Sequence, residues 1–396
     1  MEDGALYELQ EVRKQPLGIY MHIPFCIKKC DYCDFLSMPA SEEIKDNYVQ
    51  AVLEEIKSYE KIADKYQVQT IYFGGGTPSV LPASHIACIL NRLKDSFQIE
   101  DFAKLEVTLE VNPGTVDKEK WKAYKSMGIN RISMGLQSTD NAMLKKLGRI
   151  HNYETFLESY KMARKTGFQN ISIDVMSALP GQTIEQYKQT IEKIVALTPE
   201  HISSYSLIIE EGTPFWNRYG EDGEQAQELP SEEEDRKMYE LTNGILKKHG
   251  YERYEISNYA KKGQESKHNS SYWTGTSYLG IGLGASSYFE GERYQNVAEL
   301  EGYLTVAGNS EVRICNRERI GEKDAMEEYM FLGLRRMCGV SKQEFQQRFG
   351  KAMESVYEKK IENLQEKGLL FVEEDRVALT EYGIDVSNYV FSEFLL

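Results

Sequence analysis

Six short β-rich segments alternate with amphipathic helical segments through the first half of the chain, and this order limits the possible folds. The predicted strands cover residues 17–22, 70–73, 105–111, 131–136, 171–175 and 202–207. The predicted helices cover residues 42–65, 83–96, 118–127, 153–166 and 184–197. Such an order builds a parallel sheet covered by helices. Six units predict an α/β fold with an open, partial (β/α)6 barrel rather than a complete eightfold one.

Polar and small residues recur where these predicted strands end. Cys26 follows the first strand, residues 74–77 follow the second, and Glu110 lies at the end of the third. Gln137 follows the fourth strand and Asp174 ends the fifth. In TIM-like barrels the functional side chains lie at the C-terminal ends of the strands. We therefore expect these residues to share one central site.

Three of the six cysteines are bunched in a C-x3-C-x2-C sequence formed by Cys26, Cys30 and Cys33. Three thiolates on one loop can hold three irons of a [4Fe-4S] cluster and leave the fourth iron open, whereas a closed electron-transfer cluster needs four. A zinc site also needs four ligands, and His22 could complete one. Free cysteines also pack in cores as small apolar residues. The spacing favours the cluster and leaves the other two interpretations open.

The second strand leads into Tyr-Phe-Gly-Gly-Gly-Thr-Pro at residues 72–78. Successive glycines let backbone groups approach a ligand closely. The sequence is not a P-loop, because no Gly-Lys-Ser/Thr follows. Alone it indicates only a tight turn, but beside the cysteine loop it indicates a binding site.

Composition excludes several classes of partner. The chain of 396 residues has a net charge of −15, which disfavours binding to nucleic acid and to anionic lipid. Three cysteines are scattered (Cys88, Cys315, Cys338), so no disulfide framework is expected. The first residues do not resemble a secretory signal, and no apolar run predicts a membrane anchor. We expect a cytoplasmic protein from a cell that makes iron–sulfur clusters.

The last quarter of the chain has a different pattern. Helices are predicted over residues 323–337, 341–349 and 352–366, and a hairpin over 369–372 and 376–379. This order is typical of a small, helical, winged-helix-like domain. Acidic residues outnumber basic ones here, which favours a structural or lid role over nucleic-acid binding. The predicted division is a barrel core (1–220), a barrel extension (221–310) and a C-terminal domain (311–396).

The cysteine loop and the glycine turn together resemble the radical S-adenosyl-L-methionine (SAM) superfamily. The resemblance implies that Cys26, Cys30 and Cys33 hold a [4Fe-4S] cluster whose open iron binds SAM. It further implies that residues 74–78 contact the methionine amino group, and that one electron from the cluster releases a 5′-deoxyadenosyl radical. The residue types suit this chemistry: soft thiolates bind iron, bare backbone accepts an amino group, and a water-excluding barrel protects a radical.

The resemblance narrows to the branch that contains oxygen-independent coproporphyrinogen III oxidase and the HemW-type heme chaperones. It covers nearly the whole chain, including residues 20–26, 74–78, 110–113, 131–137 and 174–182. The implied SAM contacts are Tyr20, Tyr32, Gly75, Gly76, Thr77, Glu110, Gln137, Arg149 and Asp174. Arg149 would pair with the methionine carboxylate, and Glu110 or Asp174 would accept hydrogen bonds from the ribose.

Three features favour the chaperone over the oxidase. The oxidase has a fourth cysteine two residues after the third, where this chain has Phe35, and it has a longer arm before its cysteines. Residues 268–273 read His-Asn-Ser-Ser-Tyr-Trp, the H-N-x-x-Y-W sequence of HemW-type proteins. In an expected loop, His268 would be an axial heme ligand, while Tyr272 and Trp273 would stack on the porphyrin. The glycine-rich residues 280–285 would close the SAM site from the far side.

The predicted function is that of a heme chaperone, which binds the cluster, SAM and heme and transfers heme to hemoproteins. Respiratory acceptors at the membrane and a homodimer formed through the cluster region follow from the resemblance. The alternative is an enzyme that oxidatively decarboxylates coproporphyrinogen III in porphyrin biosynthesis. The barrel fold alone does not decide between a chaperone and an enzyme.

Overall fold

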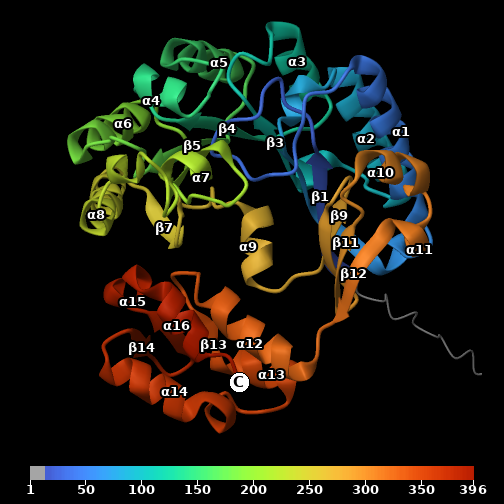
Figure 1. The fold of residues 1–396 in the computed structure, drawn as a ribbon. Coiled ribbons are helices and arrows are strands. Elements are labelled where there is room, and N and C mark those ends of the chain that lie inside the picture. Colours follow the sequence, from blue (N-terminus) through green and yellow to red (C-terminus); the bar gives the residue numbers. More distant parts are fainter. Residues whose placement is uncertain (1–13) are drawn as a thin grey trace, which may run out of the picture.

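The predicted parallel strands form the centre of one twelve-stranded sheet in the computed structural model, which describes residues 14–396 (Figure 1). All six predicted strands pair in parallel, in the order in which they occur in the chain. They are β1 (Gln15–Ile23), β2 (Tyr66–Gly75), β3 (Glu106–Val111), β4 (Arg131–Gln137), β5 (Ile171–Ser177) and β6 (His201–Ser206). The predicted parallel α/β fold is therefore confirmed.

Further strands extend both edges of this parallel sheet. The two outermost strands of the described residues do not pair with each other, so the barrel is open. On the β1 side lie β9 (Tyr278–Ile281), β10 (Ser286–Phe289), β11 (Glu292–Asn296) and β12 (Ile314–Arg319). On the β6 side lie β8 (Asn258–Ala260) and β7 (Glu252–Glu255). β9 runs parallel to β1, and the other added strands are antiparallel. A Cβ at Gly280 would lie 2.1 Å from the carbonyl oxygen of Ser286, so this strand needs glycine there.

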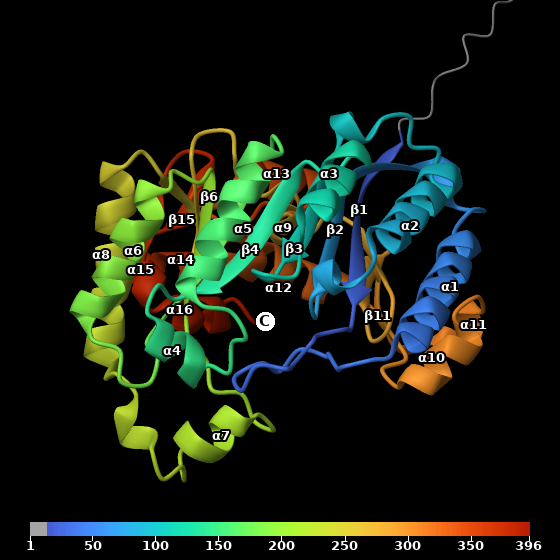
Figure 2. The same ribbon diagram turned by 90° about the horizontal axis from the view of Figure 1, so that it is seen from above.

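Helices cover the outside of the sheet (Figure 2). They are α1 (Glu42–Ser58), α2 (Ala83–Ser96), α3 (Lys118–Ser126), α5 (Tyr153–Lys165), α6 (Ile184–Ala196) and α8 (Glu232–Lys248). Ser, Asp, Asn or Thr side chains accept hydrogen bonds from the first turns of α1, α3, α5, α6 and α8.

The predicted helix over residues 42–65 was too long. α1 ends at Ser58, because the N–H of Tyr59 bonds to the carbonyl of Ile56, three residues back, and the next residues form turns. A 3₁₀ helix, Ala63–Lys65, then leads into β2.

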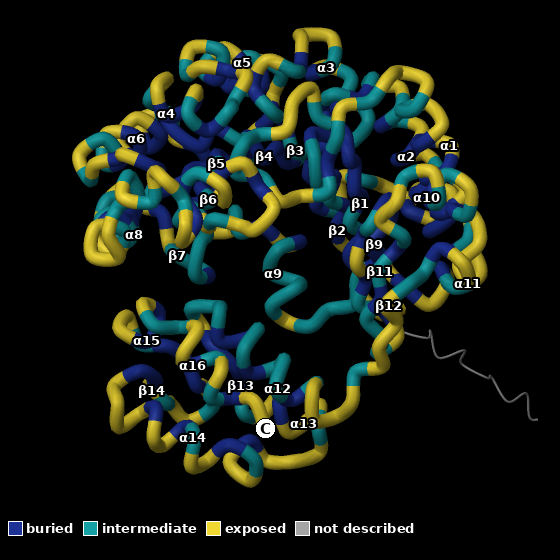
Figure 3. Tube along the Cα trace, viewed as in Figure 1, coloured by how far each residue is buried: buried dark blue, intermediate teal, exposed yellow. Residues whose placement is uncertain are grey.

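The space between the sheet and the helices is filled by one apolar core. Figure 3 shows its buried residues as dark blue stretches along the strands and helices. Large side chains such as Trp121, Tyr124 and Tyr187 are fully buried in it. The parallel strands contribute residues on both faces, as expected for a sheet covered by helices.

The C-terminal residues form a unit with its own core. Its predicted helices and hairpin are present as α12 (Glu322–Gly333), α13 (Lys342–Phe349), α14 (Glu354–Glu366), β14 (Leu370–Val372) and β15 (Arg376–Leu379). Three short elements were not predicted from the sequence: β13 (Val340–Ser341), α15 (Glu381–Asp385) and α16 (Ser387–Glu393). The predicted division at residues 220 and 310 stays a prediction.

The remaining α-helices are short. They are α4 (Asn141–Lys146), α7 (Pro214–Tyr219), α9 (Lys267–Trp273), α10 (Leu300–Val306) and α11 (Ser310–Arg313). In Figure 1, α9 lies between the barrel and the C-terminal unit. Across residues 14–396, no helix combines the length and apolar character required to cross a membrane.

Candidate functional site

The C-terminal ends of the parallel strands surround one cavity of about 360 Å³, here called the cysteine cavity. Most of the predicted site residues line it: Cys26, Cys30, Tyr32, Cys33, Gly75, Gly76, Thr77, Glu110, Gln137, Arg149 and Asp174. Parallel strands end at the same edge of a sheet, so residues far apart in sequence meet there. Tyr20 and His268 do not line this cavity.

The three clustered cysteines are free and partly exposed. The Cys26 thiol lies 3.3 Å from the Thr77 hydroxyl, and Arg149 donates to the Cys30 sulfur over 3.7 Å. Burial raises the pKa of the Cys33 thiol. Within residues 14–396, no three His, Cys, Asp or Glu side chains already have the geometry of a metal-ion site. The donor set suits iron, but the thiols would have to draw together around it.

His22 does not join the cysteines as a fourth ligand. Its Nδ1 lies 3.1 Å from the Tyr20 hydroxyl, and its Nε2 donates to the carbonyl of Leu36 at 2.9 Å. Burial lowers the pKa of the ring, which stays neutral. Zinc binding by His22 would therefore require one of these hydrogen bonds to break.

The glycine turn packs directly against the cysteine loop. Gly75 has a φ of +105°, and a Cβ there would lie 2.4 Å from the His22 ring. A Cβ on Gly76 would lie 2.8 Å from the carbonyl oxygen of Phe25. The N–H groups of Gly76 and Thr77 donate to the carbonyls of Ile23 and Phe25 at 2.9 and 2.8 Å. Because these N–H groups are used, the turn can offer carbonyl acceptors rather than donors, which suits an amino group. The carbonyl of Thr77 already accepts from the N–H of Val80 at 2.9 Å.

Two carboxyl groups lie in the wall of the cysteine cavity. Tyr72 donates to Glu110 at 2.7 Å, and Ser133 donates to Asp174 at 3.0 Å. Burial raises the pKa of Glu110 to about 7 and also raises that of Asp174. Such groups can accept hydrogen bonds from ligand hydroxyls or share a proton near neutral pH.

Arg149 and Gln137 present polar atoms without partners among the described residues. Arg149 donates to the Gly135 carbonyl at 2.6 Å and to Asn112 at 2.8 Å, yet its Nε has no partner. Gln137 has a φ of +73°, and its buried Oε1 also has no partner. Buried polar atoms are normally satisfied, so these atoms fit a cavity that receives a polar ligand.

Two lining residues were missed as site residues. Asn112 donates to Thr77 at 2.7 Å and accepts from Arg149, so it ties the glycine turn to the guanidinium. Tyr205 lies near the end of β6 and lines the same cavity. The strand-end rule that identified Asp174 would also have found Tyr205, and Asn112 stands in the 110–113 motif.

Tyr20 lies outside the cysteine cavity, on β1, and lines an adjoining cleft with Glu110 and Gly75. Its ring stacks on that of Tyr72 with centroids 6.2 Å apart. Tyr32 does line the cysteine cavity and meets the edge of Phe215.

The His268 segment is the helix α9 and not the loop that was expected. Ser266 accepts from the N–H of Asn269, and Glu106 accepts from the N–H groups of Lys267 and His268, so the first turn is capped. The buried imidazole lies 2.8 Å from the Thr70 hydroxyl and 2.9 Å from that of Tyr272. Burial lowers the pKa of His268 to about 3.

Comparison with known proteins agrees with this geometry. Residues 20–194 match the radical SAM superfamily, and residues 320–386 match the HemN C-terminal domain. The heme chaperone HemW of Lactococcus lactis is 40% identical over 97% of this chain and 98% of its own. HemW of Bacillus subtilis is 37% identical over 95% of this chain and 98% of its own.

A solved structure shares the whole fold. Coproporphyrinogen III oxidase (HemN) of Escherichia coli, a radical SAM enzyme, matches 96% of this chain and 90% of its own with a TM-score of 0.83. At 23% identity this likeness shows the fold alone. The full-length sequence similarities are the more specific finding, and by them the chain belongs to the radical SAM superfamily and, within it, to the HemW family.

Proposed function

We propose that this protein is a heme chaperone, which binds a [4Fe-4S] cluster, SAM and heme and passes heme to hemoproteins. The similarity to heme chaperones over 97% of the chain carries the proposal, because it includes both the barrel and the C-terminal unit. The cysteine cavity supports it with one thiol loop and a set of polar groups for SAM.

Membership of the superfamily implies the cluster and SAM, and the residues present fit both. Cys26, Cys30 and Cys33 would hold three irons. A bound cluster with an open iron would supply one electron to SAM.

The polar groups of the cavity would orient SAM. Arg149 would pair with its carboxylate, and the carbonyls of residues 75–77 would accept from its amino group. Glu110 and Asp174 would accept from its ribose hydroxyls. Tyr20, Tyr32 and Gln137 are proposed as further contacts, and Tyr20 would reach SAM from the adjoining cleft.

His268 is proposed to act on heme, together with Tyr272 and Trp273. Its Nε2 is held by the Tyr272 hydroxyl at 2.9 Å, so binding to iron would require this hydrogen bond to break. The neutral imidazole that burial favours is the form that ligates metals.

The proposed acceptors are hemoproteins, including respiratory ones at the membrane that are reached through protein contacts. The net charge of −15 supports the absence of nucleic-acid partners, and six free cysteines support a reducing cytoplasm. Ile27 and Phe35, each 61% exposed, lie on the cysteine loop and support a homodimer formed on this face.

The oxidase is the less supported alternative. The fold match to HemN does not carry its activity to this chain, because the identity is only 23%. Phe35 stands where the oxidase has its fourth cysteine, and its side chain is exposed at the mouth of the cysteine cavity.

One anaerobic experiment separates the two functions. The cluster is reconstituted, and the same sample receives either heme or coproporphyrinogen III with SAM and a reductant. We expect a stable Soret band, heme transfer to an apo-hemoprotein, and no protoporphyrinogen. The Phe35→Cys variant is expected to gain no oxidase activity. A decarboxylated, vinyl-bearing product with consumption of SAM would instead establish the oxidase.

A further inference from the structure

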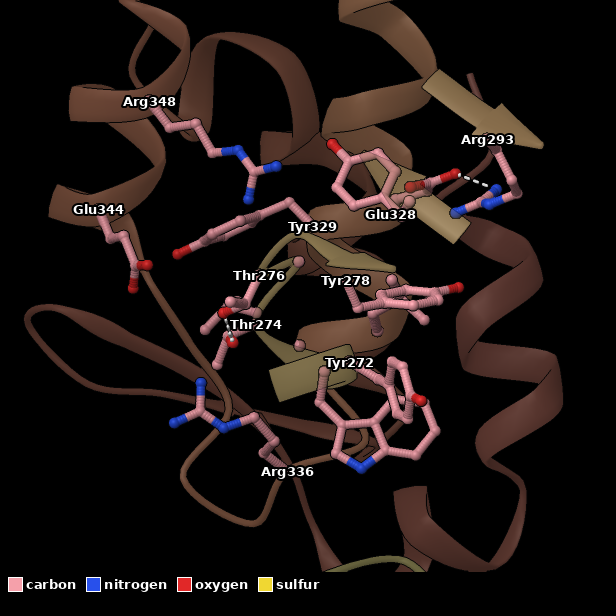
Figure 4. A pocket seen from close by; sticks show the side chains of 16 residues that line it. Tyr272, Thr274, Thr276, Tyr278, Arg293, Glu328, Tyr329, Arg336, Glu344 and Arg348 are labelled. Atoms are coloured by element: carbon pink, nitrogen blue, oxygen red, sulfur yellow. Dashed lines mark hydrogen bonds and ion pairs between the residues drawn. The ribbon is translucent and has the colours of Figure 1, made fainter. Parts of the chain in front are cut away.

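A second cavity, of about 340 Å³, lies between α9, the edge strands of the barrel, and α12 and α13 (Figure 4). We call it the aromatic cavity, because five large rings line it: Tyr272, Trp273, Tyr278, Tyr288 and Tyr329. It shares no lining residue with the cysteine cavity. Both the barrel and the C-terminal unit are needed to form it.

Aromatic and aliphatic side chains form much of its wall. The rings of Tyr272 and Tyr278 meet edge to face with centroids 4.7 Å apart. Leu332, Gly333 and Val340 contribute the aliphatic part of the lining. A Cβ on Gly333 would lie 2.3 Å from Val340, so glycine lets α12 approach that residue closely. Aromatic and aliphatic walls of this kind suit a large planar ligand.

Three arginines line the same cavity, and two of them lack an acidic partner within residues 14–396. Arg293 pairs with Glu328 at 2.8 Å, whereas Arg336 and Arg348 form no ion pair. Figure 4 shows these two on the side of the cavity away from the Arg293 pair. The exposed carboxylate of Glu344 lies on their side as well.

The guanidinium of Arg348 lies beside Gly275. The residue has a φ of +64°, and a Cβ there would lie 3.0 Å from Nη1 of Arg348. The guanidinium therefore rests against bare backbone beside the aromatic rings. Guanidinium groups bind carboxylates in a bidentate way, so the two arginines without an acidic partner can bind an anionic ligand.

We infer that the aromatic cavity is the heme-binding site, with the porphyrin between the rings and its two propionates on Arg336 and Arg348. This inference rests on the proposed function. Heme combines a planar apolar ring with two carboxylates, which is the chemistry that this cavity presents. The cysteine cavity is less suited to propionates, because four acidic and three basic side chains line it. The aromatic cavity has two acidic and three basic ones.

The helix α9 connects the proposed heme site to His268. Tyr272 forms part of the wall, and its hydroxyl bonds to Nε2 of His268, which does not line the cavity. His268 therefore stands directly behind an aromatic wall of the heme site. A movement of Tyr272 would open the way from the imidazole to iron.

The test removes the two charges and, separately, the two propionates. Full-length wild type, R336Q/R348Q and a matched control, R317Q/R319Q, are titrated with heme and with heme dimethyl ester, and the Soret band is followed. Arg317 and Arg319 are exposed residues of β12 outside the cavity. We expect R336Q/R348Q to bind heme about tenfold or more weakly, the control to bind it normally, and the ester to be insensitive to both pairs of changes.

The outcomes separate the site from the function. If wild type binds no heme, the proposed function fails along with the site. If wild type binds heme and R336Q/R348Q binds it as tightly as the control, the function stands and the site is overturned. Wild type alone gives a check that needs no variant, because equal affinity for heme and its ester would also overturn the role of the arginines.

Discussion

The two cavities of this protein are built in different ways. The cysteine cavity lies at the strand ends of one barrel and contains thiols, carboxyl groups and Arg149. The aromatic cavity lies between two units and contains rings with charges at its rim. The first suits a small polar ligand beside a metal centre, and the second suits a flat ligand with two carboxylates. In our proposal, electron chemistry and heme are therefore held in separate places.

A run of aromatic rings lies between the two. Tyr72 donates to Glu110 in the cysteine cavity and stacks on His268 with centroids 5.0 Å apart. His268 in turn meets the edge of Tyr272, 5.1 Å away, in the aromatic cavity. The cavities are thus separate in their lining yet in contact through His268.

The largest expected effect is loss of the cluster from the cysteine cavity, with the aromatic cavity unchanged. Cys26→Ser removes one of three thiolates, and we expect loss of the [4Fe-4S] cluster, because only two of the proposed ligands remain. Iron and sulfide content after anaerobic reconstitution measures this. The control is Cys88→Ser, an exposed residue of α2, which should keep a full cluster. A full cluster in the Cys26 variant would contradict the proposed ligand set.

The buried carboxyl group of Glu110 in the cysteine cavity should make the free energy of unfolding depend on pH. Burial raises the pKa of Glu110 from 4.5 to about 7, so the folded protein keeps a proton that the unfolded chain loses. The free energy of unfolding should therefore fall by roughly 3 kcal/mol between pH 4.5 and pH 7 on account of this group. Glu110→Gln should remove that part of the slope in chemical unfolding.

The matched control is Glu119→Gln on the exposed face of α3, where the slope should stay as in wild type. An unchanged slope in the Glu110 variant would mean that this carboxyl ionises normally.

His268, beside the aromatic cavity, should change the free energy of unfolding with pH in the opposite direction. Burial lowers its pKa from 6.5 to about 3, so only the unfolded chain gains a proton near pH 5. The free energy of unfolding should fall by about 2 kcal/mol as pH drops from 6.5 to 5. His268→Gln should flatten this dependence, and the exposed His249→Gln should not. A titrating His268 signal near pH 6.5 in NMR would disprove its burial.

The smallest expected effect concerns the rim of the aromatic cavity. Glu344 shares the rim with Arg336 and Arg348 and would repel a propionate. Glu344→Gln should therefore tighten heme binding about two- to fivefold, the scale of an exposed charge interaction. Glu358→Gln, on the outside of α14, should leave the affinity as it was. Weaker binding by the Glu344 variant would place the propionates elsewhere.

The sequence predicted the cysteine cavity far better than the aromatic one. Strand ends in a parallel barrel meet by geometry, so Cys26, Glu110 and Asp174 could be placed in one site from their order alone. Arg336 and Arg348 could not, because the packing of α12 and α13 against the barrel depends on long-range contacts. Short elements such as β13 and α9 were also missed, since few residues carry their signal.

The heme affinity of a variant without the three clustered cysteines tests the central claim most directly. The Cys26, Cys30 and Cys33 triple-serine variant and wild type are titrated with heme under the same anaerobic conditions. If the two sites are separate, the variant holds no cluster and still binds heme with the affinity of wild type. Loss of the Soret band together with the cluster would show that heme depends on the cysteine cavity, and would contradict the account.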